Sequence, residues 1–199
     1  MNKFQERKRV STAAALKDLS LQVSPGLCIR LMQSEDLRGF FSMIDQNRED
    51  LRKWLSWVDQ VTSIEDISKR YDQVQKSQAE GKSLRFLIHF EGKIIGMLAA
   101  KRIDWESLLA ELSYCLDPYY RGRGFVTRSC PALISYITDS FGITSFEIRT
   151  AIGNHPSARV PQRLGFKPTS ILENAEQLVD GNWVDHQIYR KDGHRQSAS

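Results

Sequence analysis

The sequence predicts an α/β (α+β) domain with a mixed central sheet of about six to seven strands and helices on both faces. Two observations support this class. Segments that alternate apolar and polar residues, as strands do, are interspersed with segments whose apolar residues recur at helical spacing. Their order along the chain is strand, helices, three strands, helix, strand, helix and two strands, an order that gives a mixed sheet covered by helices.

The first predicted elements follow the turn Ser24-Pro25-Gly26. Alternation over residues 27–32 predicts a strand, and Ser34 then provides the N-cap of a helix that continues to Ile44. Two further helices follow. The three predicted helices cover residues 34–44, 47–58 and 63–81. The apolar face of the second helix consists of Leu51, Trp54, Leu55 and Val58.

The main sheet is predicted to begin with an antiparallel meander. Residues 84–90 and 93–103 are joined by a tight Glu91-Gly92 turn, and residues 110–116 form the third strand. Pro118 ends this strand because proline cannot donate to a strand ladder. The remaining predictions are helices at 126–141 and 156–164 and strands at 145–151, 166–172 and 183–190.

Length and composition indicate a single globular domain. The chain has 199 residues, of which 41% are hydrophobic and 26% charged, so one core of ordinary size is expected. The longest apolar run, 94–100, has seven residues, whereas a membrane-spanning helix needs about 20. The apolar stretch near the N-terminus is too short for the core of a signal peptide. We therefore expect a cytoplasmic protein that makes no use of the membrane.

Cysteine and histidine spacing predicts neither a disulfide framework nor a metal site. The three cysteines, Cys28, Cys115 and Cys130, are odd in number and contain no C-x-x-C pair. The four histidines lack spacings such as H-x-x-x-H that hold a metal ion. No metal cofactor is expected.

The charge distribution separates the start of the chain from its body. The net charge is +4, and residues 1–17 hold five Lys or Arg against Glu6 alone, a balance of 5 − 1 = +4 that leaves residues 18–199 neutral. A neutral body gives no basis for a dedicated nucleic-acid-binding face. The predicted divisions are a basic, flexible extension (1–23), the folded domain (24–192) and a disordered tail (193–199).

A loop rich in glycine and arginine joins the meander to the next helix. Gly122 and Gly124 lie just before the first helical turn, whose free N–H groups attract phosphate oxygens if the backbone can come close. Arg121 and Arg123 add positive charge. The string is not a dinucleotide-binding fingerprint, because Thr127 stands where that motif needs glycine. It is also not a P-loop, so it predicts either a phosphate site or a solvated turn.

Three motifs in this order resemble the signature of the GNAT acetyltransferases. The string from Arg121 to Val126 resembles their Q/R-x-x-G-x-G/A acyl-CoA pyrophosphate loop, with Val126 in place of Gly or Ala. Asn154-x-x-Ser157-x-x-Val160 and Arg163-Leu164-Gly165-Phe166 resemble the second half of the signature. Residues 173–189 resemble the C-terminal hairpin of ribosomal-protein N-terminal acetyltransferases of the RimL and RimJ type. The match covers residues 27–191.

The resemblance implies the GNAT fold for residues 24–192 and direct acetyl transfer from acetyl-CoA to a primary amine, above all the α-amine of a protein or peptide. That amine has a pKa of about 7.7–8.0, so a modest general base suffices. Glu176 would be the base, and Ser157 would protonate the departing thiolate. Backbone N–H groups near Cys115 and Leu116 would bind the oxyanion where the strand splays in this fold. The residues implied to bind acetyl-CoA are Cys115, Leu116, Asp117, Arg121, Gly122, Arg123, Gly124, Phe125, Val126, Thr127 and Asn154.

Several residues keep an alternative role. Glu111, on the strand before the loop, is a second candidate for the base. Cys115 is a poor candidate for a nucleophile because no histidine partner is apparent. Trp54 is assigned to the core because it shares an apolar helix face, whereas Trp57 lies off that face and either lines a pocket or packs partly exposed.

The acceptor also stays open at this point. The alternative within enzymes is a small-molecule amine, such as a polyamine, an aminoacyl conjugate or an antibiotic. Two alternatives are not enzymes. One is a catalytically silent acyl-CoA-binding module, and the other is a nucleic-acid-associated factor that uses the basic extension. A homodimer is compatible with the sequence.

Overall fold

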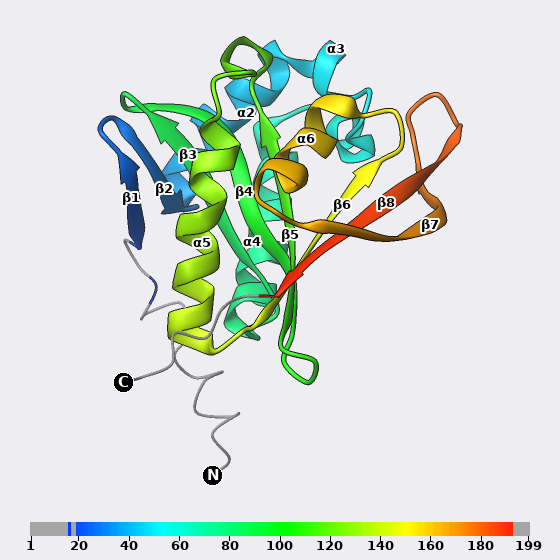
Figure 1. Ribbon diagram of the computed structural model, residues 1–199. Helices are drawn as coiled ribbons and strands as arrows, with labels where there is room; N and C mark the ends of the chain where they lie inside the picture. Colours follow the sequence, from blue (N-terminus) through cyan, green and yellow to red (C-terminus); the bar gives the residue numbers. More distant parts are fainter. Residues whose placement is uncertain (1–15, 17–18, 193–199) are drawn as a thin grey trace.

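An eight-stranded mixed sheet runs through the computed structural model, which describes Leu16 and residues 19–192 (Figure 1). Its strands are β1 (Ser20–Ser24), β2 (Leu27–Leu31), β3 (Leu84–Phe90), β4 (Lys93–Asp104), β5 (Leu109–Leu116), β6 (Ser145–Ala151), β7 (Lys167–Gln177) and β8 (Trp183–Asp192). Their order in the sheet is β1-β2-β3-β4-β5-β6-β8-β7. β5 and β6 pair in parallel, and the other neighbours pair antiparallel. The predicted class is confirmed.

The strand that the sequence analysis missed is β1, which lies inside the predicted extension 1–23. It pairs antiparallel with β2 across a turn in which Gly26 has a φ of +72°. Its five residues alternate polar and apolar, but the run is short and has only two apolar members, Leu21 and Val23, and the strand packs on its neighbours β2 and α5. Leu16 is also buried in the core. The rest of the predicted extension before residue 19, and the predicted tail 193–199, lie outside the described residues.

Among the residues that the structure describes, five helices and three 3-10 turns cover the sheet. They are η1 (Ser34–Asp36), α2 (Leu37–Gln46), α3 (Arg48–Leu51), η2 (Ser56–Gln60), α4 (Ile64–Ala79), η3 (Pro118–Tyr120), α5 (Phe125–Phe141) and α6 (His155–Arg163). α5 crosses one face of the sheet, and α2 and α4 lie behind the other (Figure 1). Among the described residues, no helix has the length and apolar character that crossing a membrane requires.

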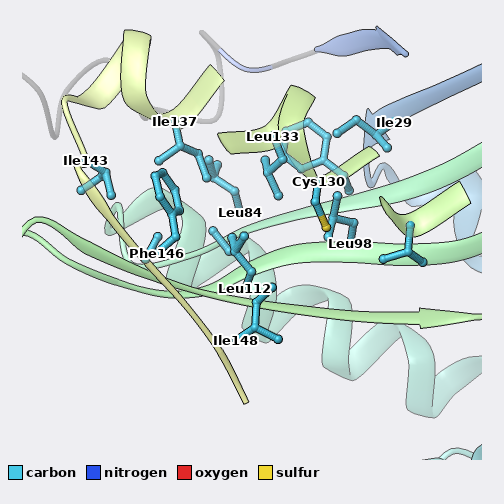
Figure 2. Packing of buried hydrophobic residues seen from close by; sticks show 14 of the residues in the cluster. Ile29, Leu84, Leu98, Leu112, Cys130, Leu133, Ile137, Ile143, Phe146 and Ile148 are labelled. Carbon is cyan, nitrogen blue, oxygen red and sulfur yellow. The ribbon is translucent and has the colours of Figure 1, made fainter. Parts of the chain in front are cut away.

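Two apolar clusters fix the helices to the two faces. Figure 2 shows the larger cluster, in which Leu133 and Ile137 of α5 pack on strand residues such as Leu98 and Leu112. The smaller cluster joins α2 and α4 to the opposite face through Leu87, Met97 and Cys115. Because successive strand residues point to opposite faces, the central strands β3, β4 and β5 each supply both clusters.

The predicted second helix, 47–58, is wrong in its second half. The chain leaves the helix after Leu51 and forms η2 from Ser56. Arg48 explains the fold-back, because its guanidinium donates to the carbonyl oxygens of Val58 at 2.7 Å and Val61 at 2.6 Å. Leu51 and Val58 are both buried. A short helix followed by a turn therefore buries the same apolar residues as an uninterrupted helix would, and the apolar spacing alone does not distinguish the two.

The parallel pair β5–β6 opens into a V at one end. The two strands pair from Leu109 with Ser145 to Leu112 with Ile148. Beyond these residues, β5 continues along β4 to Leu116 while β6 continues along β8 to Ala151. The segment 113–116 therefore has no β6 partner, and this gap positions the candidate site.

Candidate active site

Two cavities adjoin the gap between β5 and β6. The larger, of about 510 Å³, contains the glycine loop and is called the loop cavity. The smaller, of about 350 Å³, reaches across the sheet to Glu176 and His186 and is called the sheet cavity. Both are lined by Trp54, Leu55, Tyr114, Cys115, Asn154 and Ser157. The two cavities therefore meet at the open ends of the two strands.

The glycine loop leaves open space in front of α5. Gly122 and Gly124 have φ angles of +76° and +75°, which residues with a side chain rarely adopt. Gly124 is the N-cap of the helix. A Cβ built on either glycine meets no atom within 4 Å. The first N–H groups of α5 lack partners within the helix and carry partial positive charge. The loop thus forms a cradle that fits phosphate oxygens.

Most of the residues implied to bind acetyl-CoA line the loop cavity. They are Cys115, Leu116, Arg121, Gly122, Gly124, Phe125, Val126, Thr127 and Asn154. Two others face elsewhere. Asp117 caps η3 by accepting from the N–H of Tyr119 at 2.9 Å. The Arg123 guanidinium lies over the ring of Phe125 at 5.0 Å.

Positive charge surrounds the loop cavity from more than one element. Arg121 forms an ion pair with Asp50, which ties α3 to the glycine loop. Arg159 and Arg163 of α6 also line the cavity. Arg163 belongs to the motif Arg163-Leu164-Gly165-Phe166, whereas Arg159 was not predicted as a site residue, although a spacing of four on a helix places both on one face. Three cations against one acid favour a polyanionic ligand.

Ser157 lies at the meeting point of the cavities in a hydrogen-bond cluster. Its N–H donates to Oδ1 of Asn154 at 3.2 Å, so Asn154 caps α6. Its hydroxyl donates to the hydroxyl of Tyr114 at 3.3 Å, and that hydroxyl donates to the carbonyl oxygen of Ser157 at 2.9 Å. Burial raises the pKa of Tyr114, so the phenol stays protonated. Tyr114 was not predicted as a site residue, because in the sequence it is one residue of an ordinary strand pattern.

A bulge in β7 directs Glu176 into the sheet cavity. The register of β7 against β8 shifts between Leu172 and Glu176. Within the shift, Asn174 has a φ of +47°, and its N–H donates to Oδ1 of Asp185 at 2.9 Å. Such a bulge re-aims the side chains that follow it. The Asp185 of the hairpin motif therefore supports the position of Glu176.

The Glu176 carboxylate has two neighbours in the cavity. Its Oε1 accepts from the Ser56 hydroxyl at 2.7 Å, a contact between η2 and β7. Its Oε2 lies 3.5 Å from Nε2 of His186. Burial lowers the pKa of His186, so the imidazole is neutral at pH 7. Ser56 and His186 are parts of the site that sequence reasoning did not assign.

Glu111 and Cys115 line the same cavity in different settings. Glu111 is 6% exposed and lies 3.2 Å from Lys101, 3.6 Å from Arg102 and 3.7 Å from Arg149. Its charge is thus shared among three cations. Burial raises the pKa of the Cys115 thiol to about 11, so this thiol is protonated at neutral pH.

The two tryptophans lie in the wall of the site. Trp54, assigned above to the core face of a helix, is instead half-buried and lines both cavities, because the helix ends at Leu51. Trp57 lines the sheet cavity, and the Arg70 guanidinium lies 5.4 Å from the centre of its ring. The cation and the ring attract each other in this arrangement.

Two half-buried histidines predict that mild acid destabilises the fold. Burial lowers the pKa of His89 and of His186 below the ordinary value of 6.5. Both are neutral when folded, so the unfolded chain takes up protons first as the pH falls. The neutral histidines therefore contribute fully to the free energy of unfolding above about pH 6.5, and this contribution decreases as the pH falls below that value. Thermal unfolding at pH 7.5 and at pH 5.5 measures this loss of stability. The loss should be smaller in the variant His89→Gln than in the wild type. An identical loss in both proteins contradicts the assignment to His89.

Comparison with known proteins gives consistent matches. Residues 26–167 match the family described as the acetyltransferase (GNAT) domain. The ribosomal-protein-serine acetyltransferase of Escherichia coli (strain K12) is 28% identical over 172 residues, which make up 86% of this chain and 96% of that protein.

Solved structures extend the likeness to the whole fold. The microcin C7 self-immunity acetyltransferase MccE, in complex with acetyl-CoA and AMP, has a TM-score of 0.81 and 27% identity, covering 85% of this chain and 94% of that chain. RimL, a ribosomal L7/L12 α-N-protein acetyltransferase in complex with coenzyme A, has a TM-score of 0.84 and 24% identity, covering 88% and 98%.

Proposed function

The chain belongs to the acetyltransferase (GNAT) family and is an acetyl-CoA-dependent acetyltransferase, and from this membership we propose that its acceptor is the N-terminal α-amine of a protein or peptide. The main observation in favour of this proposal is the position of Glu176. Its carboxylate lies in the sheet cavity, which meets the loop cavity at Ser157. The E. coli relative, by its name, acts on serine of a ribosomal protein. That name supports a protein acceptor for this chain.

The loop cavity fits acetyl-CoA. The amide groups at the start of α5, together with Arg121, would hold the pyrophosphate, because open space and positive charge coincide there. Arg159 and Arg163 extend the positive charge toward α6. Acetyl-CoA supplies an acetyl group activated as a thioester. Gly122 and Gly124 allow the close approach that phosphate oxygens need.

Glu176 takes the proton that the attacking amine must lose. About half or more of an α-amine is neutral near pH 8, so a carboxylate acting directly or through one water is a sufficient base. The hydrogen bond from Ser56 holds the carboxylate in one orientation. The neutral imidazole of His186 adds no positive charge that would reduce its basicity. Glu111 is less suited to this role because three cations surround it.

The open edge of β5 and the hydroxyl of Ser157 complete the proposed mechanism. Segment 113–116 has no β6 partner, so backbone N–H groups near Cys115 and Leu116 are available to bind the carbonyl oxygen as negative charge develops on it. Ser157, held next to Tyr114, would donate its proton to the departing sulfur. The phenol of Tyr114 accepts from this hydroxyl and donates to the carbonyl oxygen of Ser157, so it holds the serine in position.

Removing the Ser157 hydroxyl is expected to slow the reaction without abolishing it. A thiolate is a fairly good leaving group, so the lost hydrogen bond should lower kcat by roughly 5- to 30-fold in Ser157→Ala. Tyr114→Phe should lower kcat less, because the serine hydroxyl remains. Steady-state thiol release measures both effects. An unchanged kcat in Ser157→Ala contradicts the role of its hydroxyl.

The acceptor is tested with a panel of amines. Purified protein and acetyl-CoA are mixed with peptides of varied N-terminus, polyamines, aminoacyl nucleotides and aminoglycosides, and thiol release is followed. Mass spectrometry then places the acetyl group. Acetylation of the peptide α-amine, with internal lysines unmodified, supports the proposal. Faster transfer to a small amine overturns it, and binding of acetyl-CoA without transfer to any amine favours the silent module.

A further inference from the structure

The sheet cavity contains two guanidinium groups that no carboxylate neutralises. Arg70 comes from α4 and Arg85 from β3, and both line the cavity. Within the part of the chain that the structure describes, neither forms an ion pair with a carboxylate at up to 4.0 Å. The other cations of this cavity are paired, since Lys101 lies 3.2 Å from Glu111 and Arg149 lies 3.7 Å from the same carboxylate.

Arg85 is held in the cavity by the alternation of β3. Its neighbours Leu84 and Phe86 are buried in the cluster under α5, so Arg85 points to the opposite face. Its Nε is buried without a hydrogen-bond partner. Burial and the charge of Arg70 both lower the pKa of Arg85, so the two cations lie close enough to repel each other.

Arg70 is positioned by two neutral partners. Its guanidinium donates to Oε1 of Gln60 at 2.7 Å and lies over the ring of Trp57. The acid that acts on it electrostatically, Asp66, is engaged elsewhere, because Oδ2 of Asp66 accepts from Ser63 at the start of α4. A partly buried pair of cations without a counter-ion costs stability in the empty protein.

The two ends of the sheet cavity are formed by strands that are not neighbours in the sheet. Glu176 and His186 belong to β7 and β8, whereas Arg85 belongs to β3. Four inter-strand steps separate β3 from β8, or roughly 19 Å between backbones at about 4.8 Å a step. Long side chains from both ends shorten this distance. Arg85 and Glu176 thus come from strands at opposite ends of the cavity, and an anion at the arginines would be several bonds from an amine at Glu176.

We infer that Arg70 and Arg85 bind an acidic side chain of the acceptor peptide, at its second or third residue, while the α-amine lies at Glu176. This inference rests on the proposed peptide acceptor and adds its sequence preference. A carboxylate in this cavity would receive charge-assisted hydrogen bonds from the two guanidinium groups that line it. The polar neighbours Tyr71 and Trp57 complete this end of the cavity.

The test compares matched peptides that differ by one charge. Peptides beginning Ser-Glu and Ser-Ala-Glu, and their glutamine counterparts, are assayed for kcat/KM by thiol release. We expect at least one glutamate peptide to exceed its glutamine counterpart by about tenfold or more, since a hydrogen bond to a charged group contributes this much. Arg85→Met should bring the ratio close to one, and Arg85→Lys should restore part of it. Lys69→Met, which removes an exposed charge one residue from Arg70, should keep the ratio of the wild type.

Two readouts separate this role from a structural one. Calorimetric Kd values of the same peptides for the coenzyme A-loaded protein should show the same preference as kcat/KM. Arg85→Met should unfold at the same temperature as the wild type or higher, because it removes an uncompensated charge. A clearly lower unfolding temperature assigns Arg85 to the fold and overturns the inference.

The outcomes for the peptides are equally distinct. Equal kcat/KM and Kd for glutamate and glutamine peptides overturn the inference and leave the peptide acceptor standing. Failure of every peptide to bind or react overturns both. An aminoacyl nucleotide that is preferred over all acidic peptides assigns the anion to a phosphate and overturns the peptide form.

Discussion

Glu176→Gln is expected to lower kcat by about 10²- to 10³-fold, because the amide cannot accept the proton of the attacking amine. The substitution preserves the size of the side chain, and its oxygen can still accept from the Ser56 hydroxyl at the position where the carboxylate does. The loss should therefore fall on the chemical step. Steady-state thiol release with a saturating peptide acceptor measures kcat, and calorimetry with acetyl-CoA should give an unchanged Kd.

Glu173→Gln provides the matched control. Glu173 lies three residues earlier on the same strand and is exposed, so its loss removes the same charge without touching the cavity. We expect its kcat to stay within about twofold of the wild type, as for surface substitutions away from a site. If Glu176→Gln and Glu173→Gln have similar kcat values, Glu176 is not the base and Glu111→Gln becomes the next variant to measure.

Gly124→Ala is expected to raise the Kd for acetyl-CoA at least about tenfold. The φ of +75° costs roughly 1–2 kcal/mol for a residue with a Cβ, which favours a shift of the loop. The added methyl group meets no protein atom within 4 Å and so occupies the open space in front of α5. Because phosphate oxygens need direct contact with the N–H groups there, one methyl group is sufficient to displace them.

Gly92→Ala separates the strain from the blocked cradle. Gly92 forms the turn between β3 and β4 with a φ of +76°, and a Cβ there also meets no atom within 4 Å. Both variants should lose similar unfolding free energy, yet only Gly124→Ala should lose affinity for acetyl-CoA. Similar Kd values for the two variants contradict the assignment of the glycine loop to the phosphates.

Local chemistry made the glycine loop predictable from sequence. A left-handed glycine before a helix, with arginines beside it, depends on residues 121–127 alone and needs no distant partner. The apolar runs that placed β3, β4 and β5 are equally local, since each run and the turn residues that bound it are read from one short segment. The resemblance then connected three separate motifs and named Glu176 and Ser157, which no single pattern assigns.

The rest of the site depends on contacts between segments far apart in the chain. Ser56 and Glu176 are 120 residues apart and meet because the chain folds back at Arg48, where a continuous helical pattern gave the wrong prediction. Tyr114 reaches Ser157 because β5 and β6 diverge.

By itself, the sequence predicted most of the order of the elements, the glycine loop and the family motifs, because these depend on neighbouring residues and on periodicity. The tertiary structure decided which charges have partners. Arg85 reads as one polar residue in an alternating strand, and its lack of a counter-ion follows from where α4 and the neighbouring strands place their acids. Electrostatic pairing is a property of distances across the fold, so it appears once the sheet and its helices are assembled.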